Sequence, residues 1–179
     1  MVVEAGMRDD SRSSSVVSKL ARIYTYDHAG SSKSKAHPGP NPRTAASMAA
    51  DLSALLSAAD IPRPYVVACH SYGGFIAPEF LALKTDEVVG MLFVDTNTER
   101  TNKEIHMPME ALGAIAGDVD SYKITGLDCD HKIDPGVWKG MKRDSGASEQ
   151  EPAGEAASIS ELTAKNKFEH QVMGTTQLW

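Results

Sequence analysis

The sequence of 179 residues has only two cysteines, Cys69 and Cys129. Two cysteines are too few for the disulfide framework of a small secreted protein, and their surroundings lack the ligand spacing of a zinc site. Basic residues are also few, because 18 lysines and arginines face 24 aspartates and glutamates, giving a net charge of -6. This negative field disfavours binding to nucleic acid and to anionic lipid.

Long hydrophobic runs and aromatic residues are scarce as well. No stretch approaches the about 20 apolar residues that span a bilayer, and MVVEAGMRDD reaches acidic residues before a signal-type apolar stretch forms. Aromatic residues make up 6% of the chain, which predicts a lean core. Dinucleotide-binding glycines, a phosphate loop and a metal-ligand pattern are all missing. We therefore expect a cytoplasmic protein with no membrane segment, no bound metal and no cofactor.

The first half of the sequence alternates between strand and helix patterns. Strands are predicted at residues 2–4, 22–26, 65–69 and 88–94, and helices at 16–21, 48–59 and 75–83. The run from Tyr65 to Cys69 is apolar throughout, which is typical of a strand buried on both faces. Pro78 is placed near the first turn of its helix, where a missing N–H is tolerated. Because each crossover consumes a helix, the pattern predicts an α/β fold with a parallel sheet of about four strands flanked by helices.

The second half has a different character. Residues 107–115 and 158–168 have helical patterns, whereas residues 118–134 and 142–154 are polar and rich in Gly, Asp and Ser. No strand is predicted here. We expect a core over residues 1–98 and a helical, loop-rich segment over residues 99–179.

The segment from Val66 to Gly74, VVACHSYGG, carries the clearest chemical signal. A buried strand runs into Ser71 and a helix follows at once, which is the geometry of a nucleophile elbow. Such a turn imposes strained backbone angles, so the residues two before and two after the serine must be small, and here they are Cys69 and Gly73. The helix points its first N–H groups at an oxyanion formed beside Ser71, with the Tyr72 N–H as one donor.

With these residues the chain resembles the α/β-hydrolase superfamily, in its branch of small esterases, peptidases and lactonases, from Val2 to Thr98. The family's Gly-x-Ser-x-Gly appears as CHSYG, with Cys69 in place of the first glycine. VVEAGM is similar to the third strand and oxyanion turn of the family. This implies that Gly6 and Met7 contact the oxyanion or substrate, with the Met7 N–H as the second donor.

Two further segments match the family. RIYTYDHAGSSKS resembles its fourth strand and following loop, with His28 where an arginine is common, and MLFVDT resembles its sixth strand, ending at Asp95. Some members carry the catalytic acid at that position, so Asp95 is a candidate acid or orienting residue. The alternative is a strand-end carboxylate that binds nearby backbone N–H groups.

The resemblance also implies elements that this chain lacks. The family has two strands before the VVEAG strand and two more after a helical cap, and the last two deliver an acid and then a histidine. The residues after Thr98 resemble the cap alone, so the usual order of serine, acid and histidine is not completed.

Six histidines are candidates for the missing base. His70 is next to Ser71 on the turn and is expected to project away from the path of the serine, and it is also a candidate oxyanion- or substrate-contacting residue. His28 and His37 lie in the loop after the second predicted strand. The histidines of the cap-like segment have no motif, and each is either a base or a surface histidine: His106, His131 and His170. Asp128-Cys129-Asp130-His131 is predicted to be an exposed acidic loop, because adjacent residues do not converge on one ion. Residues 8–15 are predicted to form a flexible loop on the oxyanion side.

Three functional hypotheses remain open from the sequence. The first is a hydrolase that uses Ser71 on a small hydrophobic ester, lactone or related acyl substrate. The second is a hydrolase-fold protein that binds a small molecule and promotes cyclisation or isomerisation, or only carries it. The third is an inactive truncated fragment. In each case the apolar edge of strand 88–94 is left open, which predicts a homodimer.

Overall fold

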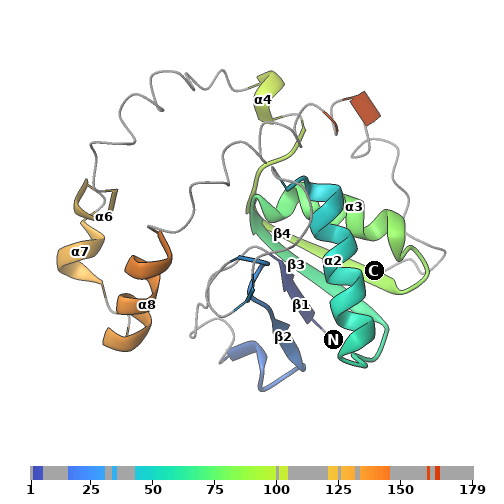
Figure 1. Ribbon diagram of the computed structural model, residues 1–179, viewed down its shortest axis with the longest axis horizontal. Coiled ribbons are helices and arrows are strands. Elements are labelled where there is room, and N and C mark those ends of the chain that lie inside the picture. The colour runs from blue at the N-terminus through green and yellow to red at the C-terminus, as the bar shows by residue number, and fades with distance from the viewer. Residues whose placement is uncertain are drawn as a thin grey trace.

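Four parallel strands form one sheet whose spatial order differs from their order in the sequence (Figure 1). The strands are β1 (Val2–Ala5), β2 (Ile23–Thr25), β3 (Tyr65–Ser71) and β4 (Val88–Thr96), arranged in the order β2-β1-β3-β4. The computed structural model describes residues 2–5, 16–30, 34–35, 43–99, 101–104, 121–124, 126–131, 134–145, 161 and 164–165. All four predicted strands are confirmed, and β3 and β4 each extend two residues beyond the expected end.

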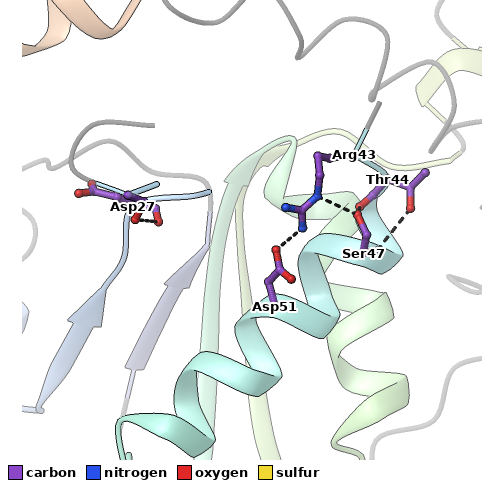
Figure 2. A network of polar contacts seen from close by, with 6 residues as sticks. Asp27, Arg43, Thr44, Ser47 and Asp51 are labelled. Carbon is purple, nitrogen blue, oxygen red and sulfur yellow. Dashed lines mark hydrogen bonds and ion pairs between the residues drawn. The ribbon is translucent and has the colours of Figure 1, made fainter. Parts of the chain in front are cut away.

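Helix α2 (Ala45–Ala58) follows β2 and is fixed at both ends by local hydrogen bonds. At its start, the Thr44 hydroxyl accepts a 3.3 Å bond from the Ser47 N–H, and Arg43 binds both Ser47 and Asp51 (Figure 2). At its end, the Ile61 N–H reaches the Leu56 carbonyl at 3.0 Å. Among the residues expected to face the core, Leu52 and Leu56 are buried, whereas Leu55 is 42% exposed.

Helix α3 (Gly73–Leu83) packs on β3 and β4 and lies beside α2 on the same face of the sheet (Figure 1). Its buried side chains form the centre of the core with those of α2 and β3, including Phe75, Phe80, Leu52 and Val67. The helix starts two residues earlier than the apolar pattern predicts. Pro78 therefore lies inside α3 rather than near its first turn, so that expectation was wrong.

The predictions made outside the sheet were less accurate. Of the short helix predicted at residues 16–21, Val16 and Val17 are helical and residues 18–20 continue as a hydrogen-bonded turn. The polar stretch 118–134 contains α6 (Ser121–Ile124) and α7 (Leu127–Asp130), and α8 (Pro135–Ser145) was not predicted. A short helix, α4 (Thr101–Glu104), follows β4. Residues 107–115 lie outside the described residues, and in the predicted helix 158–168 the described residues 161, 164 and 165 are helical.

Side chains in the carboxyl-terminal half of β4 are exposed, although they are apolar. Leu92, Phe93 and Val94 are 56%, 39% and 43% exposed, whereas the strand begins at the buried Val88. Within the described part of the chain, β4 is the last strand at its edge of the sheet. In the same part of the chain, no helix has the length and apolar character required to cross a membrane.

Candidate active site

Ser71 is the last residue of β3 and lies where the strand order of the sheet reverses. From β1 the chain first adds β2 on one side and then returns to place β3 on the other side of β1. Ala5, the last residue of β1, is the register partner of Cys69. In open α/β sheets, ligands bind outside the carboxyl ends of the strands at such a reversal. The topology therefore puts Ser71 at the edge where a ligand site is expected.

The backbone of Ser71 has a conformation that side-chain-bearing residues rarely adopt. Its φ angle is 48°, in the left-handed region that favours glycine. Tyr72 follows as the amino-terminal cap of α3, and its ring packs edge-on against Phe75 at 5.5 Å. The first turn of α3 has no acidic residue, so the partial positive charge at this helix end is not neutralised from within that turn. A strained serine thus precedes an electropositive helix end.

The end of β4 runs directly beside this turn. Ser71 is the register partner of Thr96, and the carbonyl oxygen of Ser71 accepts a 3.0 Å bond from the Asn97 N–H. One step earlier His70 pairs with Val94, so Asp95 is an extra residue in β4 and forms a bulge. Asp95 is exposed, and its φ is 45°. The structure therefore brings Asp95 and Ser71 to the same corner of the sheet.

Gly74 lets the start of α3 pack closely against the end of β4. A Cβ at this position would lie 2.1 Å from the Asn97 carbonyl oxygen and 2.7 Å from the Thr96 Cβ. Of these residues, Gly73 was predicted from the sequence as part of the turn, whereas the roles of Gly74 and Asn97 were not. The second glycine of the Gly-Gly pair was the one signal available, because a close backbone approach is a common reason for glycine.

Cys69, which replaces the first glycine of the family pattern, is completely buried. Its thiol donates a 3.6 Å hydrogen bond to the Leu92 carbonyl oxygen on β4. Burial raises the pKa of the Cys69 thiol to about 12. The side chain therefore packs as a neutral group between neighbouring strands.

The histidines that the structure describes have distinct surroundings. His70 is half-buried on β3, one residue before Ser71. His28 packs edge-on against Tyr26 at 4.8 Å, and His131 stacks on Trp138 at 4.1 Å. His37, His106 and His170 lie outside the described residues, as do Gly6, Met7 and the loop 8–15.

The acidic tetrapeptide 128–131 differs from its prediction. Its first three residues belong to α7 rather than to a loop, and only Cys129 is exposed among its described side chains. Asp128 forms an ion pair with Lys142, and the hydrogen bond from Lys142 lowers the pKa of this carboxyl group. Across the described ranges, no group of three His, Cys, Asp or Glu side chains is placed to hold a metal ion.

Comparisons with known proteins agree with this geometry. The model of the α/β-hydrolase fold family matches residues 8–123, which is more than half of the chain. An AB hydrolase superfamily protein of Gibberella zeae is 35% identical over 169 residues, covering 90% of this chain and 52% of that protein. The chain thus spans about half the length of this curated relative.

Two solved structures show the same fold at low sequence identity. Cfl2 of Burkholderia cenocepacia has a TM-score of 0.64 at 19% identity, covering 96% of this chain and 68% of that one. A thermophilic esterase from Thermogutta terrifontis has a TM-score of 0.53 at 18% identity, covering 90% of this chain and 62% of that one. With the strained serine between β3 and α3, these matches lead to one conclusion: the chain belongs to the α/β-hydrolase fold family.

Proposed function

We propose that the protein hydrolyses a small hydrophobic ester or lactone, with Ser71 as the nucleophile. The observation that carries this proposal is the φ of 48° at Ser71, a strained serine at the carboxyl edge of the sheet and directly before α3. Backbone strain of this kind persists where the surrounding structure enforces it, and it concentrates at active sites. Family membership and the esterase-like fold neighbour support the same reaction class.

In the proposed reaction the Ser71 Oγ attacks the acyl carbon of the substrate. The N–H groups of Met7 and Tyr72 hold the oxyanion, Gly6 and His70 lie on the substrate side, and the alcohol leaves as the acyl group passes to Ser71. A histidine takes the proton from Ser71 and gives it to the leaving alcohol oxygen, and His106, His131 and His170 of the second half are the candidates. Asp95 orients this base. Water then releases the acid and regenerates the serine.

A second candidate is a small-molecule-binding protein that promotes cyclisation or isomerisation without hydrolysis. The packing of two described histidines favours it, because His28 and His131 both contact aromatic rings. Packing of this kind is typical of a histidine with a structural role. Under this hypothesis the strained turn is kept as a scaffold for a ligand.

The two candidates are separated by an ester hydrolysis assay. The substrates are short-chain p-nitrophenyl esters and aliphatic lactones, and the variants are Ser71→Ala and Asp95→Asn, with the exposed Asp86→Asn as the matched carboxylate control. We expect Ser71→Ala to reduce kcat/KM by about 10³-fold or more, Asp95→Asn by about 10²-fold, and Asp86→Asn to have little effect. Hydrolysis that is unchanged in Ser71→Ala contradicts the proposal.

We also propose that two copies associate through β4. Antiparallel pairing of β4 with its symmetry mate covers the exposed Leu92, Phe93 and Val94 in both copies at once. Val94→Lys should then yield a monomer by light scattering at high micromolar concentration, whereas Leu20→Lys, at an 88% exposed position on the turn before β2, should remain a dimer. A monomeric wild-type chain at that concentration contradicts this assembly.

The free state of Cys69 and Cys129 supports a cytoplasmic location.

A further inference from the structure

Two strained residues meet at one corner of the sheet. Ser71 ends β3 with a φ of 48°, and Asp95, the bulged residue of β4, has a φ of 45°. Regular pairing resumes immediately after the bulge, where Thr96 lies opposite Ser71 and the Asn97 N–H binds the Ser71 carbonyl oxygen. The bulge is therefore held between paired residues on both sides, and its conformation depends on how closely β4 approaches the turn after β3.

Gly74, in the first turn of α3, determines how closely the end of β4 approaches this helix. The space that its Cβ would occupy is taken by the Asn97 carbonyl oxygen at 2.1 Å and by the Asn97 carbonyl carbon at 3.2 Å. These are backbone atoms, so rotation of a side chain does not relieve the collision. Any larger residue at position 74 must push the end of β4 away from α3.

From this contact we infer that Gly74 is a positioning residue that sets where Asp95 lies relative to Ser71. The inference rests on the proposed function, in which Asp95 orients the base that serves Ser71. Displacing residues 96 and 97 changes the backbone directly after Asp95 and strains the hydrogen bond to Ser71. A shift of about 1 Å in a catalytic arrangement can reduce the rate by about 10²-fold.

The first test compares Gly74→Ala with Gly140→Ala, a glycine of α8 whose added Cβ has no neighbour within 4 Å. The measured quantity is the rate of labelling of Ser71 by a fluorophosphonate, normalised to the folded fraction from circular dichroism. We expect a loss on the order of 10²-fold for Gly74→Ala. Gly140→Ala should label at the wild-type rate. Equal rates in Gly74→Ala and the wild type overturn the inference.

A double-mutant cycle distinguishes positioning from general damage. If Gly74 acts through Asp95, then Asp95→Asn has little further effect on the rate, or on its pH profile, in the Gly74→Ala background. If the two effects multiply instead, Gly74 does not act through Asp95 and the inference is overturned. Should Gly74→Ala fail to fold, Thr96→Ile enlarges the half-buried side chain on the other side of the contact, and the same cycle applies.

A structural readout separates this inference from the proposed function. If folded wild-type protein shows no labelling, the proposed function fails. Amide hydrogen exchange and amide chemical shifts still measure the contact between Gly74 and the end of β4. We then expect Gly74→Ala or Thr96→Ile to reduce the exchange protection of the Asn97 amide and to shift the Asp95 amide resonance. Unchanged Asn97 and Asp95 amides show that Gly74 does not position Asp95.

Discussion

The main-chain N–H of Asn97 donates a 3.0 Å hydrogen bond to the carbonyl oxygen of Ser71. This bond joins the end of β4 to the turn between β3 and α3, one residue after the two strands regain their register at Thr96. The strained serine is thereby attached to two strands and a helix that share the core. Such support is what a catalytic residue requires, because the geometry of a site is set by the rigid elements that carry it.

The two thiols should differ in reactivity. Cys129 is exposed on α7, whereas Cys69 is buried and its thiol pKa is raised to about 12. Since the thiolate is the reactive form, an aromatic disulfide reagent at pH 8 should modify one thiol per native chain. In denaturant it should modify both. In the control variant Cys129→Ala, the folded chain should show no modified thiol. Rapid modification of Cys69 in folded protein contradicts the burial of its side chain.

The buried Cys69 thiol should make the folded protein less stable at alkaline pH. An unfolded thiol releases its proton near 9.0, whereas the folded Cys69 retains it up to about 12. Between these values the unfolded state binds fewer protons than the folded state, so the free energy of unfolding falls as pH rises. Urea unfolding at pH 8.5 and pH 10.5 should show a smaller fall for Cys69→Ala than for the wild type. Cys129→Ala, the matched control, should behave like the wild type.

Asp60 provides a prediction about stability alone. It follows the carboxyl-terminal cap of α2 with a φ of 50°, and its N–H binds the Ser57 carbonyl oxygen at 3.2 Å. Glycine is the preferred residue at such a position because it has no Cβ to clash. Asp60→Gly should therefore raise the free energy of unfolding by about 0.5–1 kcal/mol in urea titrations. A destabilised Asp60→Gly would show that the carboxylate contributes more than the backbone strain costs.

The sheet and the placement of Ser71 were predictable because the signals are local. The continuous apolar run of β3 is followed by His70 and Ser71, and after Tyr72 come two glycines; this order alone predicts a strand, a tight turn and a helix. The bulge at Asp95 and the closeness of Gly74 to Asn97 were not predictable. Both depend on how β4 pairs with β3, and no local pattern records that pairing.

Helix α8 was missed because its stabilising contacts are tertiary. Gly136 and Gly140 lower its intrinsic helix propensity. Trp138 compensates by packing against Tyr122 at 5.0 Å and His131 at 4.1 Å. A local signal did exist, because Asp-Pro at 134–135 is typical of a helix start, and the Asp134 carboxylate accepts a 2.8 Å bond from the Gly136 N–H. The division into a core over 1–98 and a second segment over 99–179 stays a prediction.

Covalent labelling shows directly whether Ser71 is an activated nucleophile. Purified wild-type chain is incubated with a fluorophosphonate and its intact mass is measured, beside Ser71→Ala and Ser57→Ala, an exposed serine of α2. We expect one adduct per chain in the wild type and in Ser57→Ala, and none in Ser71→Ala. Absence of an adduct on well-folded wild-type protein, or an equal adduct on Ser71→Ala, would contradict the assignment of Ser71 as the nucleophile.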